Sequence, residues 1–309
     1  MFQYALGRHI AIREKTRLAL DATLLFDPSA RRNYVRRRFD LEIFTLPAEC
    51  TVLSQVAQIL PLPRVFDYSS RATTALKSAI GLERYYREAS FRYDERIWEQ
   101  TGKVYLDGYW QSEKYFRAIS QTIRQDFTLR EQSEAALMLG GVIAGEPSVC
   151  INVRRTDFTA GPSATTHGVV GLEYYRQALD LMVGRCQNAR YYIFSDDIRW
   201  CRTELVPIIP KRCTVVTHDY AGPAFRDYLW LMTQCTHFII PNSTFGWWAA
   251  WLSTSPDKIV IAPDPWFADR SIDTSDLLPS SWIRLPRSGL QQQAGSSDLL
   301  SQLVTSEGA

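Results

Sequence analysis

The stretch that decides the fold runs from Cys235 to Phe267 and reads CTHFIIPNSTFGWWAAWLSTSPDKIVIAPDPWF. It predicts a short apolar strand that ends in Pro241-Asn242-Ser243-Thr244, and an aromatic helix, Phe245 to Leu252, that follows at once. A further apolar strand is expected from Lys258 to Ala262. Strands that lead through polar residues into helices are typical of α/β domains, whose ligands bind at the carboxyl ends of the strands.

A second junction of the same kind lies earlier in the chain. The apolar strand Ser148 to Val153 leads into Asn152-Val153-Arg154-Arg155-Thr156-Asp157. Arginine suits phosphate because its planar guanidinium offers forked donors and stays charged. Asn, Ser and Thr at a helix start add neutral donors beside the positive end of the helix dipole. The two junctions together predict an anionic ligand, held between two strand ends.

The second half of the chain alternates between the two element types. We expect strands at 148–153, 190–194, 213–217, 237–240 and 258–262, and helices at 171–183, 196–205, 224–234 and 243–252. This alternation predicts a parallel sheet with right-handed crossovers. The Gly/Pro cluster at 140–147 indicates a domain boundary after residue 146.

The first half reads as a less regular α/β segment. A helix is expected through about Lys15, a strand from Thr16 to Phe26 and a strand from Gly102 to Trp110. Ser112 is expected to cap the helix that follows, and another helix is expected near 129–139. Because no strand precedes the first helix, we expect the first strand of this domain to be missing.

Composition excludes several function classes. The 309 residues carry 35 Lys plus Arg against 33 Asp plus Glu, so no basic field favours nucleic acid. Six cysteines without CxxC spacing indicate reduced thiols in a cytosolic protein. The sequence contains no run of 18 or more apolar residues, so we expect no membrane span. No Asp-x-Asp motif is present and the four histidines are scattered, so we expect no metal and no other cofactor.

Several segments resemble, in the same order, the motifs of the inverting α-1,2-fucosyltransferases. These segments are Met1–Ala5, Gly108–Phe116, Asn152–Asp157, Phe194–Asp197, Leu231–Leu252 and Ala262–Phe267. The first is similar to the end of the family's amino-terminal Gly-rich motif, and the second is similar to its acceptor-half signature. The resemblance covers the chain from Met1 to about Phe267.

The resemblance implies a GT-B fold, in which two Rossmann-like domains face a cleft. Residues 1–146 would form the acceptor-side domain, truncated at its amino end, and residues 147–286 would bind GDP-fucose. Residues 287–309 would form a polar, mobile tail. The implied reaction transfers L-fucose from GDP-fucose to the 2-hydroxyl of a terminal galactose with inversion, in the synthesis of a surface glycan or oligosaccharide. We expect activity in EDTA and a cytoplasmic location, with peripheral contact to the inner face of the membrane left open.

The chain departs from the family pattern at three points. Asn152 stands where the family usually has His, Thr156 stands where it usually has Gly, and the Gly-rich segment itself is absent. Either the start was assigned too late or the chain is a fragment. Two alternatives therefore stay open, namely an inactive remnant that binds a sugar nucleotide or glycan, and a transferase with another donor or linkage.

Donor-site roles follow from the junctions and from the resemblance. Neighbouring side chains on an extended segment point oppositely, so one of Arg154 and Arg155 should reach the diphosphate while the other braces the loop. The resemblance favours Arg154 as the phosphate ligand. The other residues expected to bind GDP-fucose are Asn152, Ser195, Asp196, Asp197, Asn242, Ser243 and Thr244. Plain helix capping is the alternative for the aspartates and for the last three of these residues.

Acceptor-side roles are expected at the second matched segment. Tyr109, Trp110 and Gln111 are the predicted acceptor-binding residues, with core packing as the alternative for the two aromatic rings. Glu113 or Asp157 is the predicted general base. The tryptophans at 247, 248 and 251 fall at helical spacing in an apolar helix, so we expect them to lie in the core rather than to stack on sugar.

Overall fold

The computed structural model describes residues 1–22, 25, 39–53, 85–156, 159, 162–210 and 212–287. Its largest element is a six-stranded parallel sheet with the order β10-β9-β8-β5-β6-β7. The strands are β5 (Ser148–Val153), β6 (Arg190–Ser195), β7 (Cys213–Val215), β8 (His237–Ile239), β9 (Val260–Asp264) and β10 (Ile283–Pro286). The chain runs outward from β5 to β7, returns to the other side of β5 with β8, and continues to β10.

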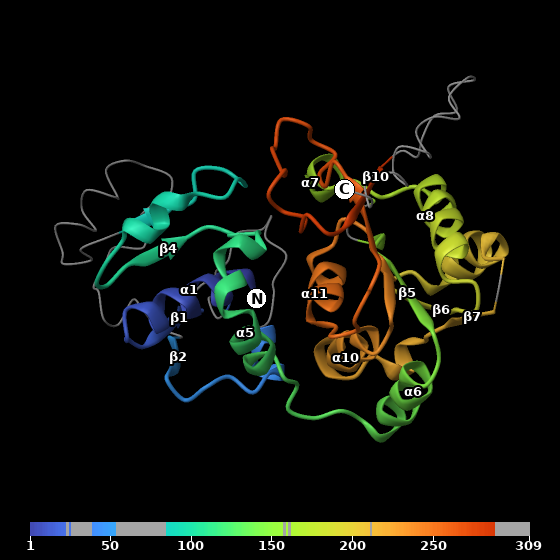
Figure 1. The fold of residues 1–309 in the computed structure, drawn as a ribbon, viewed down its shortest axis with the longest axis horizontal. Coiled ribbons are helices and arrows are strands. Elements are labelled where there is room, and N and C mark those ends of the chain that lie inside the picture. The colour runs from blue at the N-terminus through green and yellow to red at the C-terminus, as the bar shows by residue number, and fades with distance from the viewer. Residues whose placement is uncertain are drawn as a thin grey trace.

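Helices cover both faces of this sheet (Figure 1). The elements of this half are α6 (Glu134–Ala144), α7 (Pro162–Thr166), α8 (Leu172–Arg185), α9 (Ile198–Trp200), the π-helical turn η6 (Cys201–Leu205), the 3-10 turns η7 (Val206–Ile208), η8 (His218–Tyr220) and η9 (Pro223–Phe225), α10 (Arg226–Thr233) and α11 (Thr244–Leu252). Every residue of β5 is buried, and alternate side chains enter two cores. Cys150 joins the core beneath α10 and α11, whereas Val149 and Ile151 join the core beneath α8.

The first half contributes shorter elements. They are α1 (Phe2–Arg13), β1 (Leu18–Asp21), η1 (Asp40–Ile43), β2 (Cys50–Leu53), β3 (Tyr85–Arg87), η2 (Glu95–Glu99), β4 (Tyr105–Asp107), η3 (Glu113–Tyr115), η4 (Arg117–Ile119) and α5 (Ser120–Asp126). Within the described residues, β1 pairs with β2 and β3 with β4, each pair parallel. The predicted α/β class with two halves is therefore confirmed.

Two sequence expectations were wrong. The strand at 258–262 is not the last one, because β10 pairs with β9 beyond it. This edge strand was missed because its four residues, Ile283-Arg284-Leu285-Pro286, end in a proline, which usually argues against a strand. The predicted tail also begins too early, since Arg287 is described and only partly exposed, whereas residues 288–309 lie outside the described residues.

The passage between the halves also lies earlier than the predicted boundary after residue 146. Helix α6 packs on α10 of the second half, and a Cβ added at Gly140 would lie 2.3 Å from the ring of Trp230. The backbone N–H of Ser133, at the start of α6, donates to the Asp227 carboxylate at 3.2 Å. The Gly/Pro cluster forms the turn from α6 into β5, so the chain enters the second half at about 127–133.

An aromatic core joins the two halves. The ring of Phe2 on α1 lies 4.5 Å from Trp247 and 4.8 Å from Trp248, measured between ring centroids. Phe116 stacks on Trp248 at 5.4 Å, and Trp251 donates its indole N–H to Glu113 at 3.1 Å. The three tryptophans are at most 4% exposed, so their predicted place in the core is confirmed.

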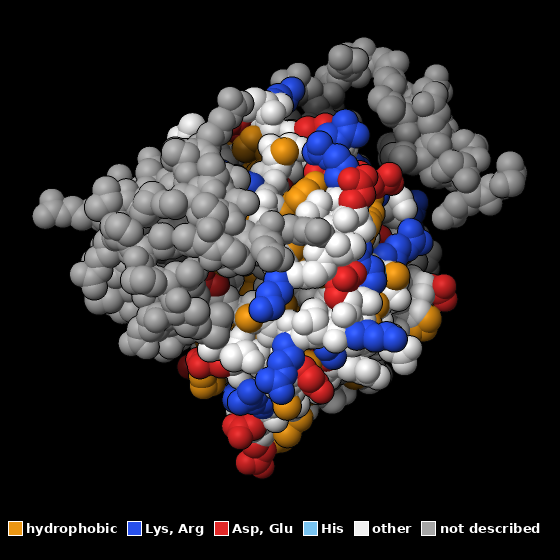
Figure 2. Space-filling view, turned by 90° about the vertical axis from the view of Figure 1, so that its left-hand side faces the viewer, with side chains coloured by type: hydrophobic (Ala, Val, Ile, Leu, Met, Phe, Trp, Pro, Cys, Tyr) orange, Lys and Arg blue, Asp and Glu red, His pale blue; other side chains and the backbone are white. Residues whose placement is uncertain are grey.

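Charge is mixed on the surface. Figure 2 shows Lys and Arg side chains interspersed with Asp and Glu on the described part of one face. All six cysteines are free thiols, and Cys150, Cys201 and Cys235 are buried. Among the described residues, no helix combines the length and the apolar character that crossing a membrane requires.

Replacing Trp251 with alanine should lower the free energy of unfolding by about 3 to 5 kcal/mol, because a buried aromatic ring is lost from the joining core. Trp251→Phe keeps a ring and removes the indole donor to Glu113, so it should cost about 1 to 2 kcal/mol. Urea denaturation of both variants measures the difference. An alanine variant as stable as the parent would show that the core does not need this ring.

Candidate active site at the carboxyl edge of the sheet

The two polar junctions meet at one point of the sheet. β5 and β8 are neighbours, and the chain leaves them toward opposite sides, which makes their carboxyl ends the place where α/β sheets bind ligands. Asn152 is at the end of β5, and Asn242 follows β8. The junctions touch, since a Cβ added at Gly246 on α11 would lie 2.6 Å from the Asn152 side-chain oxygen. The prediction that the two junctions lie together is confirmed.

Asp196, just past β6, holds the arginine loop in place. Its carboxylate accepts from the backbone N–H groups of Arg155 and Thr156, each at 3.0 Å, and from the Thr156 hydroxyl. The Arg154 guanidinium lies 3.3 Å from the same carboxylate. The described contacts of Asp196 thus organise the loop, and its predicted contact with GDP-fucose stays a prediction.

The two arginines have different surroundings. The Arg155 guanidinium stacks on the Trp200 ring at 4.2 Å and lies 3.5 Å from the Asp197 carboxylate. The Arg154 side chain is the more exposed of the two, at 30% against 21%. Arg155 therefore braces the loop, and Arg154 keeps the guanidinium that an incoming anion reaches more easily.

Capping explains one of the two aspartates. The Asp197 carboxylate accepts from the backbone N–H of Trp200 at 3.0 Å and is the N-cap of α9. The Ser195 hydroxyl accepts from the backbone N–H of Asp197 at 2.9 Å. The capping alternative is therefore confirmed for Asp197, and Ser195 supports the same turn.

The residues after β8 are built differently. Asn242 is 1% exposed, its side-chain N–H donates to the carbonyls of His167 and Gly168 at 2.9 and 3.2 Å, and its buried side-chain oxygen has no hydrogen-bond partner in the described part of the chain. Ser243 is the N-cap of α11, yet its side chain makes no capping bond. Thr244 is exposed at the first turn. Side-chain capping therefore does not account for Ser243.

The predicted acceptor-binding residues differ in how exposed they are. Tyr109 is 63% exposed, and its ring stacks on Phe91 at 5.8 Å with an interplanar angle of 10°. Trp110 is wrong as an acceptor-binding residue, because it is fully buried and packs edge-on against Tyr115. Gln111 is partly buried, and its contact with an acceptor stays a prediction.

Glu88 holds the turn that presents Tyr109. Its two carboxylate oxygens accept from the backbone N–H groups of Tyr109 and Trp110 at 2.7 and 2.9 Å. Trp110 has a positive φ of 57°, which is rare for so large a residue. Burial raises the pKa of Glu88, and the two backbone donors oppose that shift. Sequence reasoning missed Glu88 and Phe91 because neither belongs to a motif.

The two predicted bases are not equivalent in the structure. Glu113 accepts a hydrogen bond from the Trp251 indole N–H. Trp251 lies five residues after Gly246 on α11, which is about 7.5 Å along the helix axis. Gly246 is the residue of α11 that contacts Asn152. This places Glu113 in the joining core and away from the strand ends. Asp157 lies outside the described residues, so its role stays a prediction.

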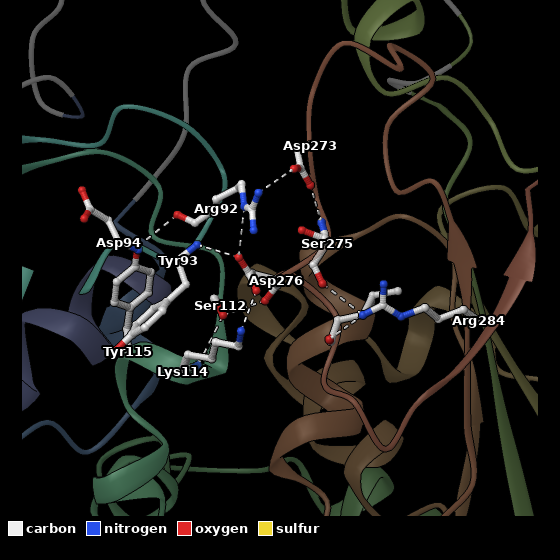
Figure 3. A network of polar contacts seen from close by, with 11 residues as sticks. Arg92, Tyr93, Asp94, Ser112, Lys114, Tyr115, Asp273, Ser275, Asp276 and Arg284 are labelled. Atoms are coloured by element: carbon white, nitrogen blue, oxygen red, sulfur yellow. Dashed lines mark hydrogen bonds and ion pairs between the residues drawn. The ribbon is translucent and has the colours of Figure 1, made fainter. Parts of the chain in front are cut away.

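A polar network fixes the first half of the chain against the second half (Figure 3). The Asp276 carboxylate accepts from the Lys114 ammonium at 2.6 Å and from the backbone N–H of Tyr93 at 2.9 Å. Its backbone carbonyl accepts from the Ser112 hydroxyl at 2.6 Å. Arg92 lies 3.8 Å from the same carboxylate. The expected capping role of Ser112 is confirmed, since it also accepts from the backbone N–H of Lys114.

The hydrogen bonds of Asp276 should make the stability of the protein depend on pH. Burial acts to raise the pKa of Asp276, but the donors Lys114 and Tyr93 and the charge of Arg92 outweigh it, so the pKa lies below its usual value. A lowered pKa in the folded state means that the carboxylate stabilises the fold above its ordinary pKa, near 4, and loses this effect as the pH falls.

Asp276→Asn should therefore lower the free energy of unfolding at pH 7 by about 1 to 3 kcal/mol, as expected for losing hydrogen bonds to a charged group. The difference from the parent should shrink below about pH 4. Asp273→Asn is the matched control: the Asp273 carboxylate is half-exposed, lies 3.7 Å from Arg92 and accepts from the Ser275 backbone N–H at 2.9 Å, so its replacement should cost less than Asp276→Asn. Urea denaturation across the pH range measures both. A pH-independent difference would contradict the role of the carboxylate charge.

A cavity between the two halves lies apart from the strand-end site. It has a volume of about 290 Å³ and is lined in part by Phe127, Trp230 and Leu252. Leu252 ends α11, so this cavity lies at the opposite end of that helix from Asn242. Within the described ranges, no three His, Cys, Asp or Glu side chains gather as metal ligands would.

Comparison with known proteins identifies the family. The sequence profile described as Glycosyl transferase family 11 matches residues 82–285. The chain belongs to this family. It is 32% identical to the alpha-1,2-colitosyltransferase of Escherichia coli over 203 residues, which cover 65% of this chain and 69% of that protein. As a family 11 member, the chain is a glycosyltransferase.

Two further relatives extend the match. The family 11 chain is 28% identical to the O-antigen biosynthesis glycosyltransferase WbnK of Escherichia coli over 297 residues, covering 92% of this chain and 96% of that protein. It is 31% identical to human galactoside alpha-(1,2)-fucosyltransferase 1 over 157 residues, covering 48% of this chain and 42% of that protein. The resemblance to the α-1,2-fucosyltransferases is therefore confirmed at the level of the family.

Proposed function

We propose that the protein transfers L-fucose from GDP-fucose to the 2-hydroxyl of a terminal galactose, with inversion, during synthesis of a surface glycan or oligosaccharide. The observation that carries the proposal is the meeting of the Arg154 loop with the Asn242 turn at the switch point of the sheet. The named activities of the human and Escherichia coli relatives support the linkage and the glycan class.

The reaction needs two kinds of help from the chain. The acceptor oxygen forms a bond to the anomeric carbon of fucose while the bond from that carbon to the diphosphate breaks, and GDP leaves with the electron pair. Arg154 supplies positive charge to the departing diphosphate, which is the role that a metal ion has in other transferases. The hydroxyl proton passes to a carboxylate. The place of Glu113 in the joining core favours Asp157 for this role.

The acceptor would lie on the stacked pair of Tyr109 and Phe91. An exposed aromatic face suits the apolar face of a galactoside ring, and the edge of Phe91 meets Phe267 of the donor half at 5.1 Å between centroids. Phe267 in turn lies 5.1 Å from His167, whose carbonyl accepts from Asn242. This row of rings links the exposed tyrosine to the strand-end site.

We infer that the reaction takes place in the cytoplasm, because all six cysteines are free thiols. Cell fractionation tests whether the protein also contacts the inner face of the membrane. A donor other than GDP-fucose is the competing proposal, favoured by the colitosyltransferase relative. The proposed reaction requires no metal, so activity should persist in EDTA.

The deciding experiment offers GDP-fucose and a panel of β-galactosides to the purified chain, with mass-spectrometric detection and linkage analysis of the product. A fucosylated galactose linked at its 2-hydroxyl would support the proposal. Product from another sugar nucleotide alone would favour the competing donor. Binding of GDP without product from any donor would favour the inactive remnant.

Arg154→Ala should lower kcat by about a hundredfold to a thousandfold, the usual cost of removing one preorganised donor from a developing negative charge. Arg154→Lys keeps the charge without the fork and should lose less activity. Thermal melting of both variants shows whether the loop is still folded. Unchanged turnover in the folded alanine variant would remove Arg154 from the mechanism.

Tyr109→Ala should raise KM for the galactoside by about twofold to tenfold, because one aromatic stacking contact contributes roughly 0.5 to 1.5 kcal/mol. KM for GDP-fucose should stay the same. Tyr109→Phe keeps the ring and should behave like the parent. Equal KM for the acceptor in the alanine and phenylalanine variants would contradict the stacking role.

A further inference from the structure

One cation of the donor half lies outside the motifs and has no role so far. Arg287 follows β10, whose last residue, Pro286, pairs in register with Asp264 at the end of β9. Because the sheet is parallel, Arg287 leaves it at the same carboxyl edge as Arg154 and Asn242. The ligands of such sheets bind at this edge.

The Arg287 side chain lies close to the Asn242 turn. One terminal nitrogen, Nη1, donates to the Trp266 carbonyl at 3.0 Å. The other, Nη2, lies 2.8 Å from the position that a Cβ on Gly168 would occupy. The Gly168 carbonyl itself accepts from the Asn242 side chain at 3.2 Å. Gly168 thus lies between the Arg287 side chain and the Asn242 turn, where the donor site is proposed.

Gly168 is what allows this approach. Its φ is +58°, a conformation that residues with a Cβ rarely adopt, and a Cβ there would collide with the guanidinium. The glycine at 168 therefore lets the backbone and the arginine share one small space beside Asn242.

Within the described residues, the Arg287 guanidinium has no counter-charge. Nη2 is buried and has no hydrogen-bond partner there, and no described carboxylate forms an ion pair with Arg287. Burial lowers the pKa of Arg287. Arg284, three residues earlier and within β10, has instead an ion pair with Asp264 at 3.6 Å. Arginines withdrawn from water are normally paired with an anion, which Arg287 lacks among the described residues.

We propose that Arg287 is a second diphosphate ligand, which binds the leaving GDP from the β10 side while Arg154 binds it from the β5 side. This assignment rests on the proposed function of the site. With both guanidinium groups in place, the two negative phosphates meet two fixed positive charges, as metal-free departure of a diphosphate requires. The phosphate also supplies the acceptor that Nη2 lacks.

The test is calorimetric titration of the full chain with GDP and with GMP. Arg287→Gln should raise the Kd for GDP tenfold or more, and should raise the Kd for GMP less, because GMP has one phosphate. Arg284→Gln is the matched control, because Arg284 lies three residues earlier in β10, and it should change the Kd for GDP less than twofold. Arg287→Lys should lie between the parent and Arg287→Gln, because it keeps the charge and loses the fork.

The outcomes separate the inference from the function it rests on. A parent protein that does not bind GDP would overturn the proposed donor site itself. A parent that binds GDP, with an equal Kd in folded Arg287→Gln, would overturn only the role of Arg287. If Arg287→Gln melts too early to titrate, Arg287→Lys decides, and a parental Kd in that variant together with parental discrimination between GDP and GMP would reject the forked contact.

Discussion

The aromatic core between α1 and α11 is the constraint on which the rest of the structure depends. Helix α11 begins at the Asn242 turn, and its tryptophans pack against Phe2 and Phe116 of the other half. One helix therefore forms both the edge of the proposed donor site and the contact that holds the first half. Protein interiors are close-packed, so a shift of either half along this contact would also move the turn before α11.

The proposed site contains arginine side chains that are held in place by the surrounding structure. Asp196 and Asp197 fix the loop after β5 through backbone and guanidinium contacts, so that Arg154 is held in place before any ligand arrives. A preorganised charge stabilises a developing charge without reorganising during the reaction. The half-buried Arg287 extends this arrangement to the far side of Asn242, where no sequence motif pointed.

The sequence predicted those parts of the molecule that local pattern determines. The strands β5 and β8, the polar residues at their ends and the buried tryptophans all follow from apolar periodicity and from strand-to-helix junctions. The alternation of side chains along an extended segment predicted that one of Arg154 and Arg155 braces the loop, and the contacts of Arg155 with Trp200 and Asp197 show which one does. By contrast, Glu88 and Asp276 act on residues distant in sequence, and no local pattern specifies such contacts. The exposure of Tyr109 beside a buried Trp110 depends on a left-handed residue that the sequence does not mark.

The close contact between Asn152 and Gly246 carries a consequence for how this site changes during evolution. The side-chain oxygen of Asn152 occupies the space where a Cβ at residue 246 would lie, 2.6 Å away. A larger residue at either position therefore needs a compensating change at the other, or the helix must move off the sheet. The two junctions, although far apart in sequence, should therefore evolve together. Homologues should show paired rather than independent substitutions at positions 152 and 246.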